Sequence, residues 1–215
     1  MERHVTTVDL PGLKRRSRAD ETRRRLLDAA LAVFTKKGYR DAAMDEIVQA
    51  AERSKGAAYF HFPSKKDIFK AVLSRLADML EEKVERAIRS AGSPLERLES
   101  ALSAVLDTFV KHRSLARIAL IDLADAGDSM DDTMHGIRGR FASLIQRHLD
   151  VAVEQGAIDP VNTRLVSLAW FGAVNELVVS WLRSESSPDL AREMPELRAL
   201  LLRSVGVPVN ARDRG

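Results

Sequence analysis

Aromatic rings occupy four consecutive positions of the chain, Tyr59 to Phe62. On a helix, Ala58 and Phe62 are four residues apart and share one face, so both are expected to point into a core. Helical phase then leaves Phe60 and His61 on the outside. An exposed Phe ring can contact thymine methyl groups, and exposed Tyr, His and Lys side chains can donate hydrogen bonds to phosphate oxygens. This chemistry suits contact with nucleic acid.

Two short helices joined by a tight turn are predicted to hold these rings. Apolar spacing predicts one helix over Met44–Ala51 and a second over roughly Lys55–His61, which together make a helix-turn-helix arrangement. Small residues at the start of the second helix would let its backbone come close to a DNA groove. The residues expected to face outward are Lys55, Gly56, Ala57, Phe60 and His61, and those placed to reach phosphate oxygens are Tyr59, His61 and Lys65.

Charge is unevenly distributed along the chain. Residues 1–70 carry 16 Lys and Arg against 10 Asp and Glu, a net charge of +6, whereas the other 145 residues carry 18 against 21, a net charge of −3. The basic end is where a polyanion is expected to dock. Within it, the run Lys14, Arg15, Arg16 and Arg18 forms either a solvated tail or an arm that lies along the minor groove.

Nearly every segment after Ala19 shows helical spacing of apolar residues, and none shows sustained strand-like alternation. The sequence therefore predicts an all-α fold of about nine helices. The first helix is expected from Asp20 to Gly38, and a long fourth helix, capped by Ser64, is expected to link two domains. Later helices are expected from Pro94, from Ser114 to Gly127, from near Ser129 to Gly156, over 162–183, and from near Pro195 to Val205.

Composition narrows the classes of function. With 45% hydrophobic and 30% charged residues, the 215-residue chain resembles soluble globular proteins. It contains no Cys, which excludes disulfides and thiolate metal sites, fits a reducing cytoplasm, and with the scattered His residues predicts no metal and no cofactor. The apolar stretch from Leu165 to Leu182 contains Asn175 and Glu176, so a helix buried on two sides is expected there and no membrane span.

The segment SKGAAYFHFPSKKDIFKAVL, preceded by AAMDEIVQAAE and by an Arg-rich first helix, resembles the TetR family of bacterial transcriptional regulators over Ala19 to about Leu76. The resemblance implies four regions: a basic flexible arm (1–18), a helix-turn-helix DNA-binding domain (19–64), a helical ligand-binding and dimerisation domain (65–207) and a tail (208–215). It also implies that Lys55, Gly56, Ala57 and Phe60 face bases, while Tyr59, His61 and Lys65 hold the DNA backbone.

The same resemblance implies a homodimer, formed through the helices expected at about 162–183 and 195–205, that presents two recognition helices to a palindromic operator in double-stranded DNA. Two positions depart from the family pattern. Ala43 stands where a Thr commonly caps the second helix, and Glu52 with Arg53 replaces the usual Gly-Val of the turn. Glu52 brings negative charge near DNA and is expected to be strained in a turn of that shape.

A small-molecule effector, largely apolar, is expected in the C-terminal domain. The candidate ligand-binding residues are Phe109, Met134, Phe141, Trp170 and Asn175. Met and aromatic residues at helical spacing are also what plain packing requires, and Asn175 could equally satisfy its amide with a neighbouring carbonyl or bond across a dimer.

The leading hypothesis is a ligand-responsive repressor that a small molecule releases from its operator. A helical adaptor that binds small molecules or proteins without DNA is the alternative, and an enzyme that uses the helical cavity is a third. The sequence offers no Ser-His-Asp spacing, Gly-rich phosphate loop or paired carboxylates for catalysis, so we expect no enzyme.

Overall fold

The computed structural model describes residues 18–122, 131–184 and 190–207. Within these ranges the chain forms nine α-helices, one π-helical segment and no strand, which confirms the all-α prediction. Residues 1–17, with most of the expected basic arm, and the tail 208–215 lie outside the described residues. The elements are α1 (Arg18–Asp41), α2 (Met44–Ala50), α3 (Lys55–His61), α4 (Lys65–Arg89), α5 (Pro94–Lys111), α6 (Arg113–Arg117), η1 (Ile118–Asp122), α8 (Asp131–Glu154), α9 (Thr163–Arg183) and α10 (Leu190–Arg203).

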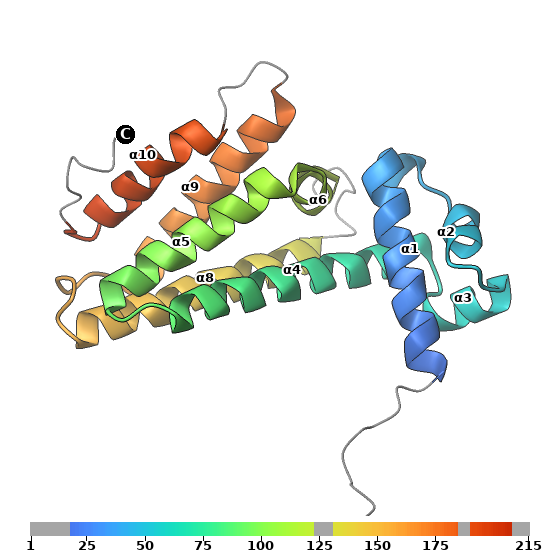
Figure 1. The fold of residues 1–215 in the computed structure, drawn as a ribbon, viewed down its shortest axis with the longest axis horizontal. Coiled ribbons are helices and arrows are strands. Elements are labelled where there is room, and N and C mark those ends of the chain that lie inside the picture. The colour runs from blue at the N-terminus through green and yellow to red at the C-terminus, as the bar shows by residue number, and fades with distance from the viewer. Residues whose placement is uncertain (1–17, 123–130, 185–189, 208–215) are drawn as a thin grey trace, which may run out of the picture.

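The N-terminal head consists of α1, α2, α3 and the beginning of α4 (Figure 1). Its core contains Phe34, Ile47 and Phe69, all at most 1% exposed, and Tyr39 stacks on Phe69 with a centroid separation of 4.2 Å. The core continues along α4 as far as Leu73. The first turns of α4, beyond the boundary expected at residue 64, therefore supply part of the apolar face that α1, α2 and α3 bury, and the domain bounds stay a prediction.

Capping side chains explain where the head helices begin. Ser54 Oγ accepts a hydrogen bond from the Ala57 amide at 3.2 Å, and Ser64 Oγ accepts one from the Asp67 amide at 3.2 Å. These caps place α3 and α4 where the sequence predicted them. At Gly38 the backbone of α1 is non-helical, with φ 78° and ψ 169°, a conformation that only glycine adopts readily.

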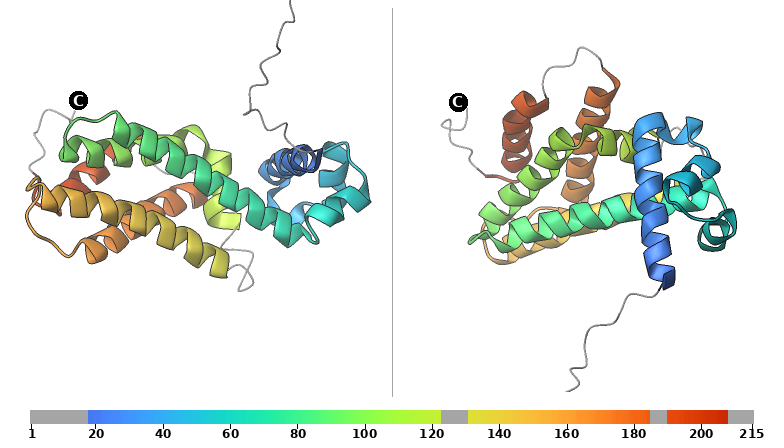
Figure 2. Two further views of the ribbon diagram at one scale, coloured as in Figure 1. Left: turned by 90° about the horizontal axis from the view of Figure 1, so that it is seen from below. Right: turned by 45° about the vertical axis from the view of Figure 1, so that its right-hand side comes forward.

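The C-terminal domain consists of α4 to α10. In Figure 1, α4 runs from the head along the domain, α8 lies beside it, and α5 lies between α4 and α10. Figure 2 shows the same arrangement from two further sides, with the head at one end of an elongated molecule. This geometry makes α4 a continuous rod between the two domains, as its unbroken apolar stripe predicted.

Two predicted helices in this domain differ from the structure, one in helix type and one in its start. The helix expected from Ser114 begins at Arg113 and changes from α to π geometry at Ile118, and its expected end at Gly127 lies outside the described residues. The last helix begins at Leu190 rather than near Pro195. Its first turns are anchored by Leu190 and Met194, both buried in a cluster with Leu106, so tertiary packing holds helix on both sides of the proline.

A second connection joins the head to the C-terminal domain. Ile118 of η1 is 2% exposed and belongs to the core of the head, and Leu115 and Ala119 pack against the same core. At the end of η1, the Asp122 carboxylate accepts a hydrogen bond from the Tyr39 amide at 2.9 Å, directly after the kink at Gly38. The head is thus held by both α4 and the α6–η1 segment, of which sequence spacing predicted only the first.

Candidate nucleic-acid interface and ligand cavity

Helix α3 buries Ala58 and Phe62 and exposes Phe60 as helical phase predicts, whereas His61, which was expected on the outside, is half-buried. Ala58 and Phe62 are 0% and 3% exposed, whereas Phe60 is 81% and Tyr59 is 46% exposed. The guanidinium of Arg23 lies 5.2 Å from the Phe62 ring centroid and so ties the end of α3 to α1. At 81% exposure the Phe60 ring contributes little to the core, so it is free to contact a partner from the outer side of α3.

The beginning of α3 is small and open. Lys55 and Gly56 are exposed, and Ala57 and His61 are half-buried. A Cβ atom built at Gly56 would meet no atom within 4 Å, so nothing covers this part of the helix. The backbone of α3 can therefore approach another molecule closely, with Phe60 one turn further along the same outer side.

Lys55 has a partner that the sequence did not indicate. Its Nζ lies 2.8 Å from Asp45 Oδ2 on α2, and this hydrogen bond and charge raise the pKa of Lys55. Both side chains are more than 60% exposed. Such an exposed pair is weak, so DNA could replace Asp45 as the partner of Lys55 at little cost.

Lys65 does not project outward as expected. Its ammonium donates hydrogen bonds to the carbonyl oxygens of Tyr39, Arg40 and Ala42 at 2.9, 3.0 and 2.9 Å, and it lies 4.7 Å from the Tyr39 ring centroid. An ammonium has three donors, and all three are engaged. In this structure the side chain therefore caps the end of α1, and the phosphate contact of Lys65 stays a prediction.

We expect Lys65→Met to lower the free energy of unfolding by about 2 kcal/mol, since three carbonyl oxygens at the end of α1 lose a charged donor. Urea denaturation followed by circular dichroism measures this loss. Lys66→Met, at the neighbouring half-buried position of the same helix, is the matched control and should change stability little. Unchanged stability together with weaker binding to all DNA sequences would instead show that Lys65 contacts phosphate and does not stabilise the end of α1.

Helix α2 begins without a hydrogen bond from an N-cap side chain. Ala43 occupies the N-cap position, and its amide donates to Glu46 Oε2 at 3.1 Å. The Lys37 ammonium pairs with the same carboxylate, and these contacts, with Lys37 first, hold the pKa of Glu46 below its usual value. The Glu46 carboxylate thus partly compensates for the Thr cap that is absent at position 43.

Glu52 in the turn is the one non-glycine residue with positive φ among the described residues, at 52°. This confirms the strain expected when Glu replaces glycine in the turn. Left-handed backbone costs a non-glycine residue about 1–2 kcal/mol, and glycine adopts it freely.

We expect Glu52→Gly to raise the free energy of unfolding by about 0.5–1 kcal/mol, because relief of the backbone strain exceeds the added entropy of the unfolded chain. Glu52→Gln removes the negative charge and keeps the strain, so it should strengthen DNA binding without stabilising the fold. Thermal unfolding and DNA titrations of both variants separate the two effects. Equal stabilisation by both substitutions would show that charge, and not backbone conformation, is the cost at this position.

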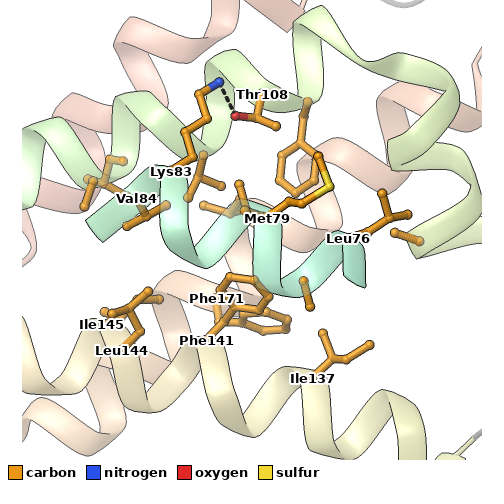
Figure 3. A pocket seen from close by; sticks show the side chains of 18 of the residues that line it. Leu76, Met79, Lys83, Val84, Thr108, Ile137, Phe141, Leu144, Ile145 and Phe171 are labelled. Atoms are coloured by element: carbon orange, nitrogen blue, oxygen red, sulfur yellow. Dashed lines mark hydrogen bonds between the residues drawn. The ribbon is translucent and has the colours of Figure 1, made fainter. Parts of the chain in front are cut away.

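A cavity of about 380 Å³ lies in the C-terminal domain and is walled by α4, α5, α6–η1, α8 and α9. Its lining is mostly apolar, and Figure 3 shows Leu76, Ile137 and Phe141 converging on it from two helices. The volume falls within the range of small-molecule sites. Met79, which is 52% exposed, also lines it, so the cavity opens to solvent beside α4.

Four of the five predicted ligand residues line this cavity: Phe109, Phe141, Trp170 and Asn175. The side chain of Met134 lies outside the described part of the structure. Trp170 is 2% exposed and its ring N–H donates to Ser204 Oγ at 3.0 Å, so this indole can offer a ligand its ring surface but not its donor. Whether these residues bind a ligand stays a prediction.

Polar lining residues were missed by the sequence analysis, above all Lys83, Thr108 and His148. His148 Nε2 is buried with no hydrogen-bond partner, and it lies 3.9 Å from Glu85 Oε1. Burial lowers the pKa of His148, so this imidazole is neutral near pH 7. No sequence signal marks these residues, because Lys83 sits in a charged run that is typical of a solvent-exposed helix face, and a single Thr or His within a helix is not distinctive.

Over the residues that the structure describes, no group of three or more His, Asp or Glu side chains is arranged to hold a metal ion. Helix α9 is long and apolar enough to cross a membrane by length and composition alone, with a mean hydropathy of 1.5. In the fold it packs against α8 and α10 of the helical domain.

The exposed α3, carried by a three-helix head and joined by α4 to a domain with an apolar cavity, defines a helix-turn-helix DNA-binding regulator. Comparison with known proteins agrees. Residues 26–72 match the bacterial regulatory proteins of the tetR family, and residues 91–197 match the tetracyclin repressor-like C-terminal domain. The chain belongs to the TetR family of bacterial transcriptional regulators.

Individual relatives are consistent with this assignment. The HTH-type transcriptional regulator SrpR of Pseudomonas putida is 32% identical over 177 residues, which cover 80% of each chain. The HTH-type transcriptional activator FasR of Mycolicibacterium smegmatis is 43% identical over 95 residues, which span 43% of FasR and 44% of this chain. The structure of FadR from Bacillus subtilis in complex with stearoyl-CoA superposes with a TM-score of 0.74 at 21% identity, covering 83% of this chain and 96% of FadR, and shows a shared fold.

Proposed function

We propose that this protein is a homodimeric, cytoplasmic repressor that binds a palindromic operator through α3 and is released when a small, largely apolar molecule enters the cavity. The observation that carries the proposal is the pairing of an 81%-exposed Phe60 on a recognition helix with an apolar cavity of about 380 Å³ in the adjoining domain. The alternative is that the protein activates transcription, and the promoter assay below distinguishes activation from repression.

At the operator, Lys55, Gly56, Ala57 and Phe60 face base edges and thymine methyl groups, and Tyr59 and His61 contact phosphates. The support is geometric: the first turn of α3 is open, and Phe60 extends beyond it. The basic N-terminal segment adds attraction that does not depend on base sequence.

The dimer forms through α9 and α10. Both helices expose large apolar side chains that nothing in the protomer covers, since Leu165 is 64%, Leu168 49% and Leu200 53% exposed. Gly172, one turn beyond Leu168, leaves open space where a side chain would stand, so a partner helix can approach α9 closely. Pairing this face with its symmetry mate buries the apolar surface that makes α9 resemble a membrane span.

Ligand binding in the cavity acts on the head through two segments, α4 and α6–η1. Both segments line the cavity and also pack against the core of the head. Leu76 of α4 and Leu115 and Ala119 of α6–η1 line the cavity, and all three also pack against the core of the head. A ligand that spreads these walls changes the spacing of the two heads in the dimer. A ligand that binds the released spacing of the heads more tightly than the DNA-bound spacing, by about 1–3 kcal/mol, lowers the occupancy of the operator.

An adaptor without DNA binding leaves the exposed α3 unexplained, and an enzyme would need a reactive pair that the cavity does not offer among its described lining residues. The proposal therefore includes no catalytic activity.

The test is titration of promoter DNA with the purified protein at increasing salt. Specific binding that weakens steeply with salt, and that an unrelated duplex of equal length does not match, supports the proposal. A reporter gene behind the same promoter then separates repression from activation. Equal affinity for both duplexes would overturn the proposal.

A further inference from the structure

One pair of polar side chains in the cavity bridges α4 and α5, in addition to His148 on α8 and Asn175 on α9. Lys83 Nζ of α4 donates a hydrogen bond to Thr108 Oγ1 of α5 at 2.6 Å, and the two side chains point toward each other in Figure 3. Thr108 Oγ1 in turn donates to the Ala104 carbonyl at 2.6 Å. The hydroxyl proton is thus committed to the helix backbone, and its oxygen is the acceptor that Lys83 uses.

Lys83 lacks a counter-ion within the described part of the chain, where no carboxylate oxygen lies within 4.0 Å of its ammonium. Arg86, the neighbouring cation that lines the same cavity, differs in this respect, because its guanidinium pairs with Glu82 Oε1 at 2.9 Å. Lys83 is half-buried, and one neutral hydroxyl satisfies one of its three donors. Two donors and a full positive charge are therefore left for another molecule.

The position of Lys83 fits a ligand with one charged end. Exposed Met79 and Glu82 mark the opening of the cavity beside α4, and Lys83 stands on the same stretch of helix. Deeper lining residues such as Leu144 and Trp170 are apolar and buried. A molecule that enters by this opening meets the Lys83 cation first and a mostly apolar interior beyond it, with His148 and Asn175 among the few polar lining residues.

We infer that the effector is an amphipathic anion, with a carboxylate or similar acidic group bound by Lys83 at the opening and an apolar chain or ring in the cavity. This deepens the proposed function by naming the chemical class of the effector. A charge-assisted hydrogen bond in a partly dry site makes such an acid bind better than a neutral molecule of the same length.

Three probes of one chain length test the charge preference: decanoate, 1-decanol and decyltrimethylammonium, each below its micelle concentration. The change in Trp170 emission, measured in a Trp181→Phe background because the chain has a second tryptophan, reports binding in the cavity that Trp170 lines. Decanoate is expected to bind about 10- to 100-fold more tightly than decanol, and the cation most weakly, from the strength of hydrogen bonds to charged groups.

Lys83→Met should abolish the preference for decanoate over decanol while decanol still binds, which shows that the cavity is intact. Lys83→Arg should keep the preference. Lys111→Met is the matched control, since Lys111 is exposed at the end of α5 and does not line this cavity. No binding of decanoate, equal binding of decanoate and decanol, or a preference that survives in Lys83→Met would overturn the inference.

The two proposals fail separately. Promoter titration without ligand tests the regulator, and none of the Lys83 variants is expected to change it, because Lys83 lies on the part of α4 outside the head. A protein that binds promoter DNA but shows no charge preference keeps the proposed function and loses the ligand class. A protein that selects decanoate through Lys83 but ignores its promoter loses the proposed function.

Discussion

Phe60→Ala is expected to weaken binding to the operator by about 30- to 1,000-fold and to leave thermal stability unchanged. An aromatic side chain that inserts into a partner surface contributes about 1–2 kcal/mol per contact, and a dimer makes the contact twice, so the losses add to about 2–4 kcal/mol. Stability should not change, because the ring is 81% exposed and truncation removes no core contact.

Fluorescence anisotropy of labelled promoter DNA measures this loss. Met79→Ala is the control, since it removes a comparably large, exposed apolar side chain from α4 outside the head and should not affect DNA binding without ligand. An operator affinity that survives in Phe60→Ala would exclude Phe60 from the interface and would leave its exposure without an explanation.

Leu168→Arg is expected to convert the protein to a folded monomer and to reduce operator binding at least about 100-fold. Leu168 is 49% exposed in the protomer, so the substitution leaves the protomer core untouched. At a twofold interface it buries two unpaired guanidinium groups, and each uncompensated charge costs about 2–5 kcal/mol.

Sedimentation velocity gives the oligomeric state of this variant. Ala157→Arg introduces the same charge at an exposed position between α8 and α9, away from the proposed interface, and should stay dimeric. A Leu168→Arg dimer with normal DNA affinity would place the dimer interface on another surface.

Local signals predicted the helix-turn-helix unit well, because its boundaries are set by nearby side chains. Ser54 and Ser64 cap the helices that follow them, and the four-residue spacing of Ala58 and Phe62 fixes which side of α3 is buried. The exposure of Phe60 follows from that spacing alone. The strain at Glu52 was predicted from the resemblance, because the family has a glycine at this position of the turn, and the positive φ of 52° agrees with it.

Contacts between distant segments account for what sequence reasoning missed. Lys65 resembles a phosphate-binding lysine until the fold brings three carbonyl oxygens of α1 and the following turn, some two dozen positions earlier, around its ammonium. Asp122 caps the backbone at Tyr39 across 83 positions of sequence. The change from α to π geometry begins at Ile118, which is buried in the core of the head, a contact between distant segments that local periodicity does not encode.

The cavity is lined both by residues that the sequence predicted and by residues that it did not. Aromatic residues at helical spacing pointed correctly to its walls, as Phe109 and Trp170 show. Lys83 was missed because a lysine within a charged run reads as a solvated surface residue. The packing of α5 against α4 places Thr108 beside Lys83 and forms part of the apolar wall of the cavity.

Hydroxyl-radical footprinting of the promoter bound to the protein tests the central claim most directly. Two heads related by a twofold axis predict two protected segments of related sequence, one helical turn of DNA or a whole multiple apart, both lost on Phe60→Ala. A single protected segment, or protection without symmetry that Phe60→Ala leaves in place, would contradict the account.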